Sequence, residues 1–167
     1  MGFFPDPLHP ALVHFPIALT LAALFLDLAA RHPRARGWGG AAVVLWLMAG
    51  AGSVVAVLTG NAAHDDAVIP QAARAIVEQH EGRAELFMWC VLAYAALRLV
   101  LAWKGRFVGV LAWVMLAGAI GLAGLVGSVG HLGGQLVFKH GVGTAPVQRG
   151  LVAPSPAGSA TPTGHPE

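Results

Sequence analysis

Eight histidines are the residues of this chain most able to do chemistry, and six of them lie within or next to long hydrophobic segments. Imidazole is the commonest protein ligand for metal ions, and it also holds haem iron. A histidine within or beside a membrane span is costly and usually marks a function. The six are, in chain order, His9, His14, His64, His80, His131 and His140.

Four hydrophobic segments must position these histidines. The chain is 56% hydrophobic and only 11% charged, with a mean hydropathy of +0.68, whereas a soluble domain carries about 25% charged residues. A helix needs roughly 20 apolar residues to cross a bilayer. Because the links after the first and third segments are short, the sequence predicts an all-α membrane protein, a four-transmembrane-helix up-down-up-down bundle. The expected spans are about residues 11–30, 39–60, 84–103 and 107–130.

The transmembrane domain is expected to cover residues 1–149, and the Pro/Ser/Gly composition of 150–167 predicts a flexible tail. The third helix is expected to begin near residue 71, before its span. Helical spacing places His80 on the apolar face of this helix, so its imidazole should point inward. The other members of that face are Ala73, Val77, Ala84, Phe87 and Val91.

Basic residues in the first and third loops orient the bundle. Asp27 lies one helical turn before Arg31 and is expected to pair with it, and Arg98 is expected to extend toward the same side. Cytoplasmic loops carry an excess of Lys and Arg, so both termini should face the periplasm across a bacterial inner membrane. The six histidines would then gather at the periplasmic face. The orienting residues are Arg31, Arg34, Arg36, Lys104 and Arg106.

Histidines on facing helices can hold a b-type haem when they project at the same depth. The first and third spans of such a bundle are diagonal, which makes His14 and His80 the first choice of axial ligands. His131 with His64 or His140 could supply another pair, and His9 is a further candidate. In the fourth span, glycines recur every third residue from 118 to 130, which would let another helix or a planar cofactor approach closely.

Two other hypotheses remain open for the same residues. The histidines could hold copper or zinc at the periplasmic face. They could also bind no cofactor and serve as interface hydrogen-bonders in a structural or assembly subunit of a larger membrane complex. His80-Glu81 lacks the second histidine of a zinc-protease HExxH motif, so a self-contained catalyst is not expected. No basic patch with interleaved aromatics indicates nucleic-acid binding. The five tryptophans, Trp46 among them, are interpreted as including members of an interfacial aromatic belt.

Three motifs resemble a bacterial family of four-span membrane domains of unknown function. They are HPxxVHFPI from His9, His80-Glu81 in the third helix, and GHLGGxLVxxHGVG from Gly130. The resemblance covers about residues 7 to 145 and includes His9, His14, His80, His131 and His140. Such domains occur beside or fused to Rieske-type or c-type cytochrome modules. The resemblance therefore implies redox work at the outer membrane face, with a separate electron partner.

Overall fold

Four long helices form the part of the chain that the computed structural model describes, which is residues 9–66, 69–106 and 108–144. The helices are α2 (His14–Ala29), α3 (Trp38–Asp66), α4 (Arg74–Trp103) and α5 (Gly109–His140). A short α1 (His9–Leu12) precedes α2, and together they are long and apolar enough to cross a membrane, as is each of the other three helices. The predicted all-α, four-span fold is confirmed.

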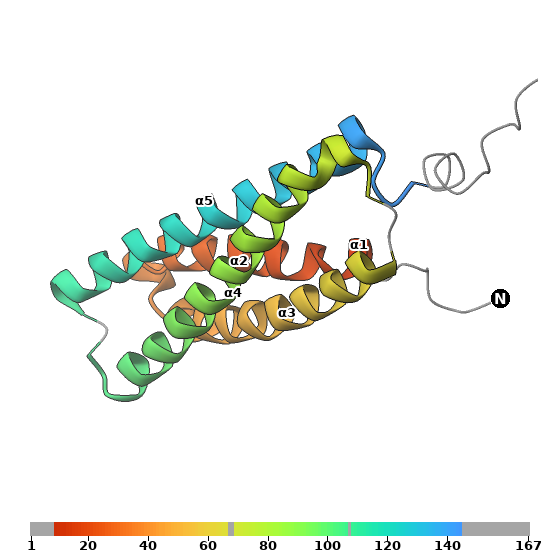
Figure 1. Ribbon diagram of the computed structural model, residues 1–167. Helices are drawn as coiled ribbons and strands as arrows, with labels where there is room; N and C mark the ends of the chain where they lie inside the picture. The colour runs from red at the N-terminus through yellow and green to blue at the C-terminus, as the bar shows by residue number, and fades with distance from the viewer. Residues whose placement is uncertain (1–8, 67–68, 107, 145–167) are drawn as a thin grey trace, which may run out of the picture.

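The four helices close into a ring, with each helix packed against the two that adjoin it (Figure 1). α3 lies between α2 and α4, and α5 packs against both α4 and α2, which leaves α2 diagonal to α4. Short 3-10 turns, η1 (Pro33–Ala35) and η2 (Gln71–Ala73), lie in the connections. α1 packs against α3.

Two helices run further than their expected spans. α5 continues past residue 130 to His140, so His131 lies inside the helix and not at its end. The helix ends where Gly141 adopts a left-handed conformation, with φ of 64°, a common helix C-cap. α3 likewise reaches Asp66 and includes His64. Hydropathy marks the lipid-embedded part of a helix, whereas the helix itself stops at a capping residue. The predicted tail, 150–167, lies outside the described residues.

The bundle has two chemically different ends. The histidine end is formed by α1, the end of α3, the start of α4 and the end of α5, so the first and last described residues lie there together (Figure 1). The arginine end carries the connection at residues 30–37 and residues 104–106, with their basic side chains.

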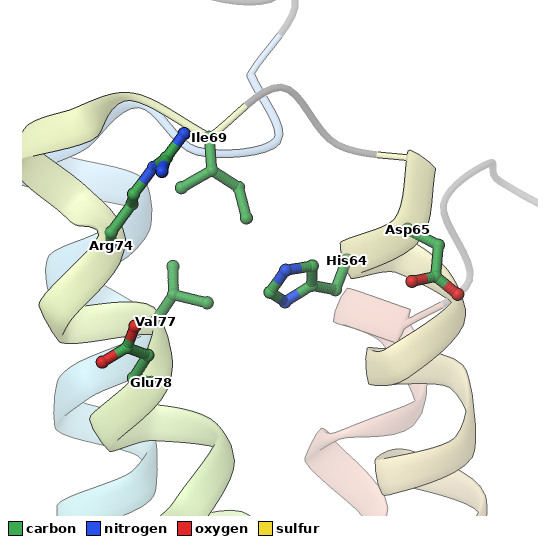
Figure 2. Close-up of a pocket in the computed structure, with 6 residues that line it drawn as sticks. All are labelled: His64, Asp65, Ile69, Arg74, Val77 and Glu78. Carbon is green, nitrogen blue, oxygen red and sulfur yellow. The ribbon is translucent and has the colours of Figure 1, made fainter.

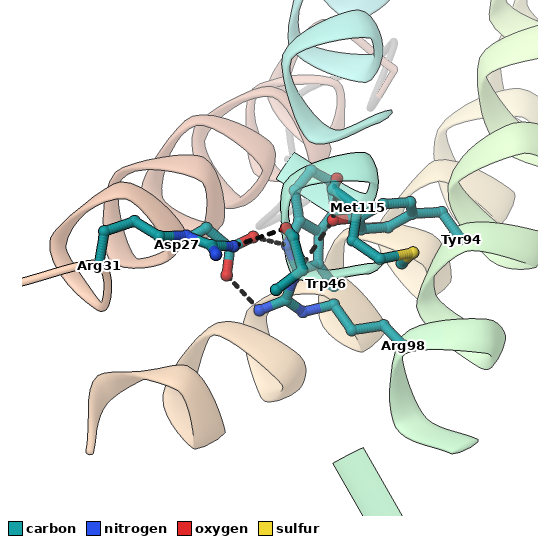
Figure 3. A network of polar contacts seen from close by, with 7 residues as sticks. Asp27, Arg31, Trp46, Tyr94, Arg98 and Met115 are labelled. Atoms are coloured by element: carbon teal, nitrogen blue, oxygen red, sulfur yellow. Dashed lines mark hydrogen bonds and ion pairs between the residues drawn. The ribbon is translucent and has the colours of Figure 1, made fainter. Parts of the chain in front are cut away.

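A buried polar network near the arginine end joins all four long helices (Figure 3). Asp27 of α2 and Arg98 of α4 form an ion pair, and their residues are 2% and 1% exposed. Trp46 Nε1 of α3 donates a hydrogen bond of 2.9 Å to Asp27 Oδ2. Arg98 also donates to the Tyr94 hydroxyl at 3.3 Å, and that hydroxyl donates to the Met115 carbonyl of α5 at 3.0 Å.

This network overturns the expectation for Arg98 and bears out a charge interaction between Arg31 and Asp27. Arg98 does not extend toward the membrane surface, because its guanidinium pairs with Asp27 inside the bundle. Arg31 contributes a charge interaction to Asp27, but its side chain also donates to the Ala112 carbonyl at 2.7 Å. Trp46 is fully buried and is therefore not part of an aromatic belt.

We expect Asp27→Asn to destabilise the bundle by about 3 kcal/mol or more, because breaking a buried pair leaves one charge uncompensated. Thermal unfolding of the purified protein in detergent measures this. The double variant Asp27→Leu/Arg98→Met should recover most of the loss, since apolar side chains replace both charges. Exposed Glu78→Gln is the control. An Asp27→Asn protein as stable as the parent would show that the pair does not hold the helices together.

Candidate functional site

His9 is held against α3 at the histidine end. Its Nδ1 lies 3.2 Å from the Thr59 hydroxyl oxygen, and that hydroxyl donates its own proton to the Val55 carbonyl at 2.9 Å. The tautomer of His9 that carries its proton on Nδ1 and donates it to Thr59 fits this arrangement, and His9 also has a hydrogen bond with the Ala56 backbone. The ring also packs on Gly60, where a Cβ atom would come within 2.9 Å of His9 Cε1. Only glycine leaves this space for the imidazole.

His80 is held in the same way against α5. It lies on the buried face of α4 that was predicted from helical spacing, and Val77, Phe87 and Val91 on that face are buried. Its Nδ1 donates to the Val129 carbonyl at 3.1 Å. A Cβ on Gly133 would come within 3.3 Å of His80 Cε1. The inward placement of His80 is thus confirmed.

His9 and His80 together form what we call the histidine pair. Both rings are half-buried, and they lie close enough for charge on one to affect the other. Because the Val129 carbonyl can only accept, the neutral His80 ring carries its lone pair on Nε2, and His9 matches it in the tautomer whose Nδ1 donates to Thr59. A second hydrogen bond that fixes the tautomer and orientation of the ring is typical of metal-ligating histidines. The pair is positioned by α1, α3, α4 and α5.

The other candidate histidines have different surroundings. His14 is exposed, and its Nδ1 donates to the Pro10 carbonyl at 2.7 Å, one turn earlier in its own segment. His131 is exposed and bonds to Gln135 at 2.8 Å. His64 pairs with Glu81 across the gap between α3 and α4. His140 is half-buried at the end of α5. The structure therefore places His9 within range of a charge interaction with His80, whereas His14 is exposed.

A cavity of about 490 Å³ lies beside this site, between the end of α3 and the start of α4. Figure 2 shows the His64 imidazole pointing across it toward α4, while the Asp65 carboxylate points away from that helix. Val77, one turn before His80, forms part of its wall, although neither member of the histidine pair lines it. Its remaining lining residues are Ile69, Arg74 and Glu78.

Two imidazoles make up this site among the residues that the structure describes. Across residues 9–66, 69–106 and 108–144, no three His, Cys, Asp or Glu side chains converge closely enough to hold a metal ion.

The glycines of α5 have separate roles. Gly118 packs against the Tyr94 ring and Gly130 against Ile17, as expected for close helix packing. A Cβ on Gly121, Gly124 or Gly127 would meet no atom within 4 Å, so this part of the glycine series makes no close contact inside the bundle. The glycines that make room for imidazoles are Gly60 and Gly133. Sequence reasoning missed these contacts, although Gly133 lies in the HLGGQ motif.

The chain belongs to the family described as "Predicted membrane protein (DUF2231)", whose pattern matches residues 5–146. That range includes the whole described bundle and all six candidate histidines. No curated protein and no solved structure matches the chain.

Gly133 and its neighbour Gly134 provide a matched test of the site. Alanine in a helix interior is favoured over glycine by about 1 kcal/mol, and a Cβ on Gly134 would meet nothing within 4 Å. We expect Gly134→Ala to be stabilised slightly and to leave His80 undisturbed. Gly133→Ala should displace the imidazole and weaken its bond to Val129. NMR of ¹⁵N-histidine-labelled protein reports the His80 Nδ1–H signal. Equal signals in the two variants would contradict the proposed packing.

Proposed function

We propose that this protein is a membrane-embedded electron-transfer subunit that binds a b-type haem through His9 and His80. The observation that carries the proposal is the histidine pair itself. Two half-buried imidazoles from different helices interact electrostatically, each is held through its Nδ1, and Nε2 would be the nitrogen left to coordinate iron.

The number of ligands favours haem over a bare metal ion. Haem iron receives its equatorial nitrogens from the macrocycle, so a b-type site needs only two axial groups from the protein. Structural zinc takes four protein ligands, and catalytic zinc takes three. The described residues bring no such group of three together, whereas the histidine pair meets the requirement of haem.

Burial and orientation favour His9 over His14 as the partner of His80. His14 is exposed and bonds within its own segment, whereas His9 packs against α3 on the side where it interacts with His80. His131 and His140 remain candidates for a second site, and His64 is engaged with Glu81.

The cavity beside the pair supplies further support. Its volume of about 490 Å³ lies in the range of about 300–1,000 Å³ that small-molecule sites occupy. Ile69 and Val77 provide apolar wall, and Arg74 is a cation able to pair with a propionate. A macrocycle at the histidine pair would extend toward this space. The haem would supply the one-electron chemistry, while the protein would fix its ligands and surroundings.

Electron entry and exit should both occur at the histidine end. By the positive-inside rule the arginine end would face the cytoplasm, and the pair and both termini would then lie at the periplasmic face of a bacterial inner membrane. The partner would be a separate redox protein, such as a c-type cytochrome or a Rieske-type protein.

A non-redox role has one specific observation in its favour. Five of the six candidate histidines already have a hydrogen-bond partner within the chain, as expected for a structural or assembly subunit. A visible spectrum separates the two functions.

The parent protein, purified from native membranes, should show a Soret band and sharp α and β bands on reduction. His9→Ala and His80→Ala should each abolish these bands, because each removes one axial ligand. His32→Ala, at the arginine end, is the matched control and should keep the spectrum. His14→Ala should keep it as well.

Three results would redirect the proposal. Loss of the bands in His14→Ala with retention in His9→Ala would assign the ligand to His14. A colourless parent with stoichiometric copper or zinc would indicate a metal-ion site. A colourless, metal-free parent would indicate the structural role. Circular dichroism of each variant, together with restoration of the bands in His80→Gly by added imidazole, separates ligand loss from misfolding.

Cysteine labelling tests the orientation. In a Cys90→Ala background, a cysteine replacing exposed Asp65 should react in intact cells with a membrane-impermeant maleimide. A cysteine replacing exposed Arg34 should react only after the membrane is opened. The reverse pattern would place the histidine end in the cytoplasm.

A further inference from the structure

A second cavity, of about 500 Å³, lies at the arginine end beside the buried ion pair. Asp27 forms part of its wall, and Arg31 and Arg36 line it. The cavity therefore brings two cations from the connection after α2 next to a charged group inside the bundle.

The electrostatic balance of this cavity is positive. The Asp27 carboxylate accepts from Trp46 at 2.9 Å, forms an ion pair with Arg98 and interacts with the charge of Arg31. With Arg36 also at the wall, three cations lie at or beside the cavity against this one carboxylate. The Arg31 guanidinium is also fixed in place, because it donates to the Ala112 carbonyl at 2.7 Å. An anion in the cavity would therefore find a guanidinium group that is already held in position.

Two long helices begin at the same cavity. Gly39 is the second residue of α3 and Gly109 the first of α5, and both line it. Neither helix has an acidic residue in its first turn, and Val108 provides no side-chain cap to α5. A Cβ on either glycine would meet nothing within 4 Å, so the backbone is accessible from the cavity, although the Gly39 N–H itself donates to the Arg36 carbonyl at 3.4 Å. Helix N-termini present N–H groups and partial positive charge, which adds to the attraction of the arginines for an anion.

We propose that this cavity binds the phosphate group of an anionic phospholipid. A bilayer supplies phosphate at the ends of the spans, where the cavity lies, and basic pockets between transmembrane helices bind lipid headgroups. Guanidinium groups suit phosphate because their planar N–H donors can bond two oxygens at once. This site is independent of the histidine pair, which lies at the opposite end of the bundle.

The test uses the full chain in detergent, with phosphatidylglycerol, phosphatidylcholine or inorganic phosphate as the probe. Native mass spectrometry counts bound lipid, and a thermal shift reports stabilisation. Phosphatidylglycerol should remain bound and raise the unfolding temperature more than the zwitterionic lipid does. Arg31→Gln and Arg36→Gln should each weaken its binding about five- to tenfold. Arg34→Gln removes an equal charge from the same connection but lies outside the cavity, so it should bind as the parent does.

Each other outcome overturns the proposal. Equal weakening by Arg34→Gln would mean general surface attraction and not a site. Stabilisation by inorganic phosphate alone would identify a soluble anion as the ligand. Equal binding of phosphatidylglycerol and phosphatidylcholine would show that the net charge of the lipid does not determine binding. Because Arg36 is exposed, its substitution tests the cavity even if Arg31→Gln unfolds the protein.

Discussion

The ion pair between Asp27 and Arg98 is the interaction on which the arrangement of the helices depends. Inside a bilayer, lipid tails are as apolar as leucine side chains, so burial of apolar surface does not drive helices together. Charged side chains within spans must instead find partners. Here the partners come from different helices. Trp46 adds α3 to the pair, and Tyr94 extends it to the backbone of α5. One polar network therefore fixes how all four long helices face one another.

When the polar network fixes the rotation of a helix about its own axis at the arginine end, it also fixes that rotation at the histidine end. His80 precedes Arg98 by 18 residues in the uninterrupted helix α4, and Gly133 follows Met115 by 18 residues in α5. Eighteen residues make five turns at 3.6 residues per turn, so both members of each pair lie on one face. The faces that α4 and α5 turn toward the ion-pair network at the arginine end are those that hold the His80 imidazole at the histidine end.

The same geometry explains what the sequence could predict. Hydropathy and helical spacing are local, so they located the four spans and the inward face of α4. The choice of His14 as an axial ligand depended only on its expected depth in the membrane. His14 precedes Asp27 by 13 residues, about three and a half turns, and so it lies on the opposite face of α2. The pairing of Asp27 with Arg98 joins residues 71 positions apart, whereas sequence spacing indicated only the nearby Arg31, which does interact with the charge of Asp27. The rotation of each helix about its axis, and the pairing of residues from different helices, are determined by how the helices pack and not by local sequence.

The two ends of the bundle are suited to different tasks because of the distance between them. Eighteen helical residues span about 27 Å, so the histidine pair and the ion-pair network lie close to opposite surfaces of a bilayer. Within the part of the chain that the structure describes, the arginine end carries only His32, whose exposed ring accepts from the Arg34 backbone N–H at 3.3 Å. A carrier at the histidine pair would thus have no imidazole-held counterpart at the other surface. This arrangement is consistent with the proposed function, in which electrons would be exchanged at one face while the basic end anchors the subunit in the opposite leaflet.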